Sequence, residues 1–161
     1  MKEAERKMPR LYPHDVKEIP GSRALIVAVR EQQVPWAIVT SGTKPYAEEW
    51  FKLVSLPLPP VMVNAEDVEH GKPDPSCYTL ACQRLALPLS APMLVVEDSP
   101  AGIRAGKASG FTVLGLLTTH SLDEIRGAGA DYIIKDLSDA KLLAEDAAKE
   151  EGFLIELRDT R

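Results

Sequence analysis

The stretch MLVVEDSPAGIRAGKASG, residues 93–110, carries the clearest fold signal in the chain. Its first four residues form an apolar run that ends at the acidic pair Glu97 and Asp98, as expected of a buried strand that reaches the surface at its carboxyl end. Ser99 and Pro100 are typical of a helix start, and the final glycine is typical of a helix end. The stretch therefore predicts a buried strand followed at once by a helix.

The same alternation of strands and helices runs along most of the chain. Continuous apolar strands that alternate with helices are typical of a parallel sheet covered on both faces. We therefore expect a Rossmann-like, doubly wound, mainly parallel α/β sheet in three layers, with ligands at the carboxyl ends of its strands. The strands are expected at 36–40, 61–63, 93–97, 112–116 and 132–134, the helices at 21–33, 44–54, 76–87, 100–110, 122–127 and 139–148, and a final strand or docked tail at 153–157.

The composition fits one globular domain. The chain has 161 residues, of which 45% are hydrophobic and 27% are charged, and its net charge is −5. This balance excludes a disordered or collagen-like chain, and the negative charge argues against a nucleic-acid partner. No apolar run reaches the roughly 18–20 residues of a membrane span, and residues 1–18 lack the apolar region of a secretory signal. We therefore expect a cytoplasmic protein with no membrane or nucleic-acid partner.

Three polar clusters are expected at the carboxyl edge of the sheet or in loops just beyond it. They are residues 40–43 (Thr-Ser-Gly-Thr), 71–75 (Gly-Lys-Pro-Asp-Pro) and 97–99 (Glu-Asp-Ser). Taken one at a time, they also fit structural roles: a turn with a helix cap, a solvated loop and an acidic loop at a helix N-terminus. Their presence together at one edge favours phosphoryl chemistry.

Phosphoryl transfer uses these groups for physical reasons. Adjacent carboxylates such as Glu97 and Asp98 can hold Mg²⁺, which takes one or two carboxylates together with waters and substrate oxygens. A nearby lysine, here Lys72, would neutralise phosphoryl charge. The hydroxyl and backbone N–H groups of a turn before a helix, here at Thr40 and Ser41, can bind phosphate oxygens.

The three clusters resemble motifs of the haloacid dehalogenase (HAD) superfamily. Residues 37–43 (AIVTSGT) resemble motif II, residues 71–75 (GKPDP) motif III, and residues 95–110 motif IV with its following helix. The form EDSPAGI is similar to that of β-phosphoglucomutase-like proteins and of sugar- or glycerol-phosphate phosphatases. The resemblance covers residues 19–135. It implies a HAD-type fold and a Mg²⁺-dependent phosphatase that hydrolyses a small sugar or polyol phosphate through an aspartyl-phosphate intermediate.

The resemblance also implies roles for the residues of motifs II and III. Thr40 and the backbone N–H of Ser41 would bind the transferring phosphoryl group. Lys72 would bridge that group and the nucleophile. Gly42 and Thr43 occupy positions where relatives contact the substrate, a small phosphorylated metabolite.

The resemblance also implies that the acidic pair at residues 97 and 98 binds the metal ion. Glu97 and Asp98 would hold Mg²⁺, and Ser99 would brace their loop. Motif I of the family, a strand that ends in Asp-x-Asp, supplies further oxygen ligands, the nucleophile and the general acid–base. No Asp-x-Asp occurs in the 161 residues, and Asp15, the one aspartate before motif II, follows no apolar strand. We therefore expect a weakened Mg²⁺ site and no nucleophile for the covalent step.

The absent motif also shapes the expected domain organisation. Residues 1–18 would be a lead-in or the remnant of a cap, 19–148 the HAD-like core, and 149–161 a tail or an edge strand. The family places the motif I strand between the strands at 36–40 and 93–97, so these two would either pair directly or leave apolar edges open. We expect a truncated gene product, or a chain whose missing strand another chain supplies.

Two other function classes remain open. A receiver-type signalling domain also has an acidic strand end, but its Ser/Thr and Lys strands follow the acidic pair, whereas Thr40 and Lys72 precede it. A non-catalytic module that binds phosphate or a sugar phosphate would keep the same residues. Binding without turnover would favour the module, and an Asp-x-Asp encoded upstream would favour a truncated enzyme.

Overall fold

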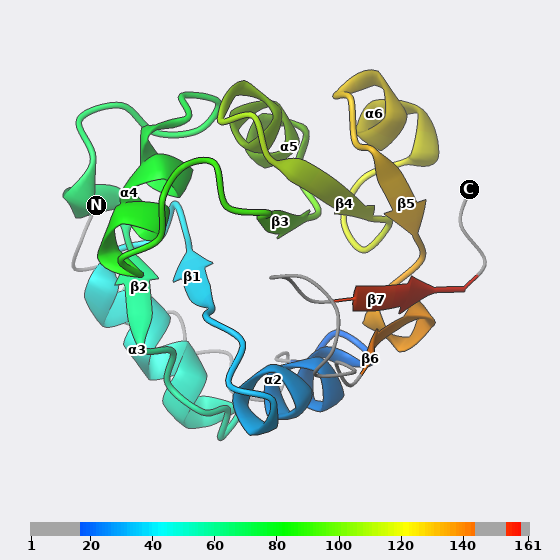
Figure 1. The fold of residues 1–161 in the computed structure, drawn as a ribbon, viewed down its shortest axis with the longest axis horizontal. Helices are drawn as coiled ribbons and strands as arrows, with labels where there is room; N and C mark the ends of the chain where they lie inside the picture. The colour runs from blue at the N-terminus through cyan, green and yellow to red at the C-terminus, as the bar shows by residue number, and fades with distance from the viewer. Residues whose placement is uncertain (1–16, 144–153, 159–161) are drawn as a thin grey trace.

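A computed structural model describes residues 17–143 and 154–158 (Figure 1). Helices and strands alternate along the described chain, as the sequence predicts. The helices are α2 (Ser22–Glu31), α3 (Lys44–Leu53), α4 (Ser76–Arg84), α5 (Pro100–Ala108) and α6 (Leu122–Gly127), with short 3₁₀ turns η1 (Ala65–Asp67) and η2 (Leu137–Asp139). The strands are β1 (Ala37–Val39), β2 (Val61–Val63), β3 (Leu94–Glu97), β4 (Thr112–Leu116), β5 (Tyr132–Ile134), β6 (Ala140–Leu143) and β7 (Leu154–Leu157).

The parallel strands form two sheets rather than one. β1 pairs with β2, and the second sheet has the order β3-β4-β5. Within the described residues, no backbone pairing joins β1 to β3. The predicted α/β class with parallel strands is confirmed. Of the two outcomes expected for the strands at 36–40 and 93–97, the structure shows the open edges.

Helices α4, α5 and α6 cover one face of the two sheets (Figure 1). α4 packs against β1 and β2, α5 against β3 and β4, and α6 against β4 and β5. α4 and α5 also contact each other, so one continuous apolar core runs from the smaller sheet to the larger one. Its fully buried members include Val63, Cys82, Ile103, Val113 and Ile125. Burial of these side chains is the main term that holds the two sheets in one molecule.

The larger sheet is buried on its other face as well. Leu114 and Leu116 of β4 belong to a second apolar cluster, whereas Val113 of the same strand belongs to the first. Leu25 of α2 and Leu137 of η2 pack into the second cluster. Successive side chains of β4 thus enter apolar clusters on opposite faces of the sheet, as expected of a central parallel strand. This explains why the sequence of β4 is a continuous apolar run.

The predicted helix at 139–148 is wrong over its first residues. β6 is a strand that pairs antiparallel with β7, with Leu142 opposite Ile155. Long-range packing overrides the local preference here, because Leu142 is buried and Leu157 packs against the second cluster. The same pairing assigns 154–157 as a strand. Residues 144–148 of that helix, 1–16 of the predicted lead-in with Asp15, and the remaining parts of the tail at 149–153 and 159–161 lie outside the described residues.

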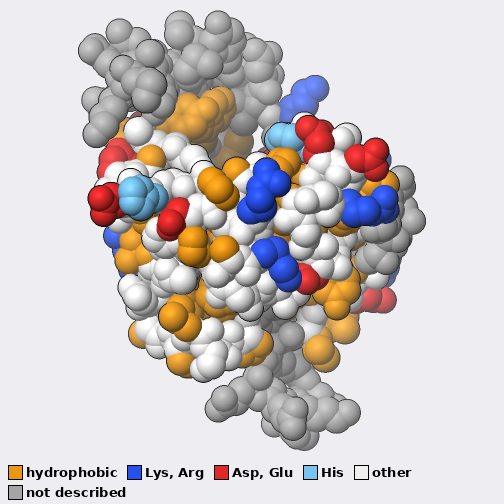
Figure 2. Space-filling view, turned by 90° about the horizontal axis from the view of Figure 1, so that it is seen from above, with side chains coloured by type: hydrophobic (Ala, Val, Ile, Leu, Met, Phe, Trp, Pro, Cys, Tyr) orange, Lys and Arg blue, Asp and Glu red, His pale blue; other side chains and the backbone are white. Residues whose placement is uncertain are grey.

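The described surface is mixed in character. On the face drawn in Figure 2, basic and acidic side chains are interspersed among scattered apolar ones. Large exposed apolar side chains include Leu58, Leu89 and Leu154. No helix within 17–143 is long and apolar enough to cross a membrane.

Candidate functional site

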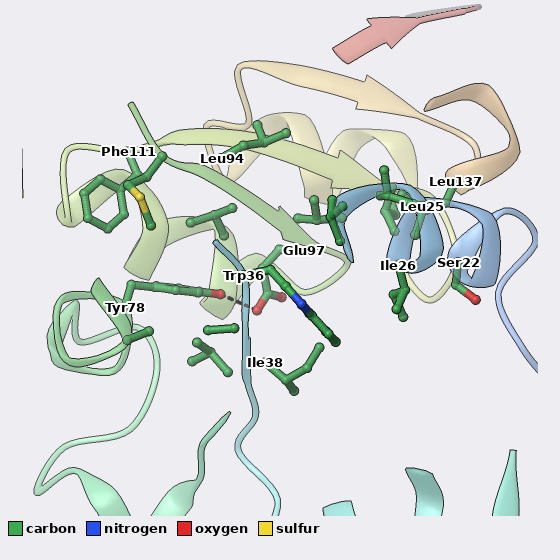
Figure 3. A pocket seen from close by; sticks show the side chains of 18 of the residues that line it. Ser22, Leu25, Ile26, Trp36, Ile38, Tyr78, Leu94, Glu97, Phe111 and Leu137 are labelled. Carbon is green, nitrogen blue, oxygen red and sulfur yellow. Dashed lines mark hydrogen bonds between the residues drawn. The ribbon is translucent and has the colours of Figure 1, made fainter. Parts of the chain in front are cut away.

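A groove of about 630 Å³ lies between the two parallel sheets. Its edges are β1 and β3, and α2 and α4 contribute apolar side chains such as Ile26 and Tyr78 (Figure 3). At the carboxyl ends of β1 and β3 the lining becomes polar. There the groove is lined by Thr40, Ser41, Lys72, Glu97, Asp98 and Ser99. The structure thus brings together the predicted site residues except Gly42 and Thr43, which are not among the lining residues.

The turn after β1 is closed by its own side chain. The hydroxyl oxygen of Thr40 accepts a hydrogen bond from the backbone N–H of Gly42 at 3.0 Å. The backbone oxygen of Gly42 in turn accepts from Ala65 N at 3.1 Å, which ties the turn to the end of β2. Thr43 precedes α3 as its N-cap residue. Because the Thr40 oxygen acts here as an acceptor, its O–H proton remains able to bind an oxygen in the groove.

Lys72 links the ends of the two sheets. Its ammonium donates to the backbone oxygen of Val39 at 3.2 Å and to the carboxylate of Glu97. The Lys72 and Glu97 side chains are only 11% and 8% exposed. The ammonium also lies 5.2 Å from the centre of the Tyr78 ring, within range of a cation–π attraction. A single buried cation therefore contacts the carboxyl end of β1 and the carboxyl end of β3.

Glu97 is held in its ionised form by four hydrogen bonds. Oε1 accepts from Lys72 and from the Tyr78 hydroxyl, and Oε2 accepts from the N–H and hydroxyl of Ser99 at 3.4 and 3.1 Å. Burial acts to raise the pKa of Glu97, but the Lys72 charge and these hydrogen bonds outweigh it, so the pKa lies below its ordinary value. Burial and the Glu97 charge raise the pKa of Tyr78, so its hydroxyl keeps the proton that it donates.

Ser99 connects this ion pair to the start of α5. Its hydroxyl donates to Glu97 and accepts from Gly102 N at 3.1 Å, which caps the helix. The helix turn passes close to the carboxylate, since a Cβ placed on Gly102 would lie 2.1 Å from Glu97 Cδ. Glycine at this position is therefore required by the space that Glu97 occupies.

Asp98 is oriented by the loop that follows β4. Its Oδ2 atom accepts hydrogen bonds from the hydroxyls of Thr118 at 3.2 Å and Thr119 at 3.0 Å. Its backbone oxygen lies 3.0 Å from Nδ1 of His120 and accepts from the Thr119 hydroxyl at 3.0 Å. These contacts leave Oδ1 of Asp98 without a partner among the described residues, so it can bind a further group.

Sequence reasoning missed four residues that shape this site. Thr118, Thr119 and His120 follow the carboxyl end of β4, the strand next to β3, so the rule that located the other clusters also applied to them. Tyr78 had no such signal. It lies within α4, and its contact with Glu97 depends on how closely that helix approaches β3.

The described residues alone do not fit a magnesium site. No group of three or more His, Cys, Asp or Glu side chains in 17–143 or 154–158 could hold a metal ion. Each oxygen of Glu97 already accepts two hydrogen bonds, which leaves Asp98 as the carboxylate able to bind a cation. Mg²⁺ requires a near-octahedral set of oxygen ligands. A magnesium ion at this position would need ligands from outside the described residues.

Residues 7–110 match the family of haloacid dehalogenase-like hydrolases. The chain belongs to this family. It is 34% identical to glycerol-1-phosphate phosphohydrolase 1 of Saccharomyces cerevisiae, over 94% of this chain and 63% of the yeast protein. It is 40% identical to hexitol phosphatase A of Escherichia coli, over 68% of this chain and 56% of that protein.

The solved structures agree with this family assignment. A hydrolase from Pseudomonas syringae matches with a TM-score of 0.75 and 26% identity, over 84% of this chain and 62% of the other. The HAD-like fold predicted from the motifs is confirmed. In each of these comparisons the chain spans less than two thirds of its relative, between 56% and 63% of the length.

Replacing Lys72 tests the ion pair. We expect Lys72→Met to lower the free energy of unfolding by about 3–5 kcal/mol at neutral pH, because it leaves Glu97 buried and unpaired. The double variant Lys72→Met/Glu97→Gln should recover most of this loss, since no uncompensated charge remains. Urea denaturation measures both, and equal losses in the single and double variants would contradict the ion pair.

The pH dependence of the same variants gives a second check. Because the folded-state pKa of Glu97 is lowered, the wild type gains stability from this group above its unfolded pKa and loses it as the pH falls through the folded value. In Lys72→Met burial is opposed only by the hydrogen bonds from Tyr78 and Ser99, so we expect the pKa of Glu97 to lie above its wild-type value. The variant should therefore recover stability relative to the wild type on acidification.

Gly102→Ala tests the space that Glu97 occupies. Alanine is preferred over glycine in a helix by about 1 kcal/mol, yet we expect this substitution to destabilise the protein by about 1–3 kcal/mol, because its Cβ overlaps the carboxylate. Gly127→Ala in α6 is the matched control, since a Cβ there meets nothing within 4 Å and should be neutral or stabilising. Thermal unfolding of the two variants with the same sign of change would refute the overlap.

Proposed function

We propose that this chain provides the phosphate-binding part of a HAD-family phosphatase that acts on small sugar or polyol phosphates. The observation that supports this most directly is the position of Lys72 between the carboxyl ends of β1 and β3. Two of its three N–H donors bind Val39 and Glu97, and the third remains for an anionic oxygen. The names of the yeast and E. coli relatives agree with a phosphorylated polyol as the substrate class.

Three groups would bind the phosphoryl oxygens. The Thr40 hydroxyl proton and the Lys72 ammonium line the same end of the groove as the exposed turn residue Ser41, whose backbone N–H would be the third donor. The N-terminus of α3 follows this turn by three residues, and the partial positive charge of a helix N-terminus favours an anion. Gly42 and Thr43 would position this turn rather than contact the phosphoryl group.

We also propose that catalysis by the complete enzyme depends on Mg²⁺. Asp98 would contribute one oxygen ligand, and the Thr118 and Thr119 hydroxyls would keep its carboxylate oriented. Glu97 would act through its ion pair with Lys72, and Ser99 would brace both. When bound, the ion would offset the negative charge of the phosphate ester.

The covalent step would require a nucleophile from outside these 161 residues. The sequence has no Asp-x-Asp, and the chain covers 63% of the yeast phosphatase. This favours a chain that binds phosphate without turning it over by itself, whether as part of a larger enzyme or as a non-catalytic module.

Thr40→Val tests the phosphate site without disturbing the ion pair. We expect it to weaken binding of inorganic phosphate by about tenfold, which corresponds to the loss of one hydrogen bond to a charged group. Thr112→Val, at the amino end of β4, should leave the affinity unchanged. Titration calorimetry measures both, and a folded wild-type chain that binds no phosphate would contradict the proposed site.

Turnover is measured on the same proteins with Mg²⁺, glycerol phosphate and hexitol phosphates. We expect no phosphate release above the protein-free control from the 161-residue chain. Release at ordinary enzyme rates, about 1–10³ s⁻¹, would contradict the assignment of the nucleophile to a residue outside the chain.

A further inference from the structure

The connection between α3 and β2 contains three of the thirteen prolines of the chain (Figure 1). They belong to residues 56–60 (Leu-Pro-Leu-Pro-Pro), the proline segment. Proline fixes its own φ angle and disfavours the helical region for the residue before it. Each residue from Leu56 to Pro60 is a proline or precedes one, so the backbone favours a polyproline II conformation. In agreement, no helix, strand or hydrogen-bonded turn occupies residues 56–59.

The fold fixes the proline segment at both ends. Before it, the guanidinium group of Arg23 donates to the backbone oxygens of Val54 at 2.7 Å and Ser55 at 3.1 Å. After it, Val61 begins β2 and pairs with Ala37 of β1. A segment that is held at both ends loses little conformational entropy when a partner binds, so this one is suited to recognition as a rigid ligand.

Exposure along the proline segment follows the turn of a polyproline II helix, which has three residues. Residues three apart therefore share one edge of such a helix. Leu56 and Pro59, on the first edge, are both half-buried. On the second edge Pro57 is half-buried and Pro60 is exposed, and Leu58 on the third edge is 61% exposed. The protein thus covers one edge and leaves apolar side chains of the other two open to a partner.

The proline segment presents apolar side chains and free carbonyl groups but no charge. Residues 53–63 contain no charged side chain. Within the described chain, no donor binds the backbone oxygens of Pro57, Leu58 or Pro59. Tryptophan and tyrosine combine a large apolar face with an N–H or O–H donor. The segment is therefore complementary to a groove lined by these two types of side chain.

We propose that the proline segment is a docking site for a WW domain of another protein. WW and SH3 domains both bind polyproline II segments in aromatic-lined grooves. SH3 domains in addition bind a basic residue beside the prolines, and residues 53–63 contain none, which favours the WW domain. Leu58 and Pro60 would enter its groove, and an aromatic N–H or O–H of the partner would donate to the carbonyl groups between them.

This docking site is separate from the site of the proposed function. None of residues 53–60 lines the groove between the two parallel sheets. The inference therefore does not depend on phosphate binding, and the binding test below contains no phosphate.

The test measures binding of the full 161-residue chain to a panel of isolated WW domains and, in parallel, to a panel of isolated SH3 domains. We expect at least one WW domain to bind and to show a shifted indole NMR signal from the tryptophan of its groove. Leu58→Asp should weaken this binding by about tenfold or more, because burial of the leucine side chain is lost. Pro60→Ala should weaken it several-fold, because φ is no longer fixed.

The chain contains a matched control at 87–89, which repeats the sequence Leu-Pro-Leu. Leu89 is 53% exposed, but Ala91 N donates to Pro88 O at 2.9 Å, so this copy forms a turn rather than an extended ligand. We therefore expect Leu89→Asp to leave the affinity for the WW domain unchanged. An equal loss in Leu58→Asp and Leu89→Asp would show that exposed leucines bind non-specifically.

Circular dichroism establishes that each variant is folded, and Pro60→Ala serves alone if Leu58→Asp does not fold. The proposal is overturned if no WW domain binds the folded wild type, if only SH3 domains bind it, or if Leu58→Asp and Leu89→Asp lose affinity equally. It is also overturned if the wild type forms concentration-dependent dimers that Leu58→Asp abolishes, since a second copy would then cover the segment.

Discussion

The buried contact between Lys72 and Glu97 sets the geometry of this chain. The two parallel sheets share no backbone hydrogen bond in the described residues, so their separation depends on the α4–α5 core and on this one ammonium. The Lys72 ammonium contacts the last residue of each strand. It donates to the backbone oxygen of Val39 in β1 and to the carboxylate of Glu97 in β3. A buried ion pair contributes little net stability compared with an apolar pair of the same size. Its value here is positional, since it holds two strand ends at a defined spacing.

The other site residues take their positions from this pair. Glu97 accepts from Ser99, and Ser99 caps α5, so the first turn of the helix is tied to the carboxylate. The chain then turns Asp98 toward the loop after β4, where Thr118 and Thr119 hold it. The end of the groove that we propose to bind phosphate is thus formed by loops that hydrogen bonds fix to neighbouring strand ends. Such a site is preorganised and loses little side-chain entropy when an anion binds.

Local sequence patterns could predict those parts of the fold that depend on local signals. The apolar run before Glu97, the Ser99-Pro100 helix start and the turn at Thr40 all gave elements close to those observed, and the strand-end rule brought their polar residues together. The strand β6 could not be predicted in this way, because its conformation depends on pairing with β7 across ten intervening residues. Tyr78 was missed for a similar reason, since its bond to Glu97 depends on the packing distance between α4 and β3.

The absence of Asp-x-Asp and the open edges of β1 and β3 concern the same region of the molecule. The first is a property of the sequence and the second a property of the structure. Together they show that the described residues include the motif II to IV residues of the family without a strand that joins β1 to β3.

The ionisation of Glu97 tests this account most directly. The pKa of its carboxyl group is measured by NMR titration of the folded, ¹³C-labelled chain. If Lys72, Tyr78 and Ser99 hold the charged form, the pKa lies below the ordinary value of 4.5. A pKa above 4.5 would show that burial outweighs the contacts with Lys72, Tyr78 and Ser99, and it would contradict this account.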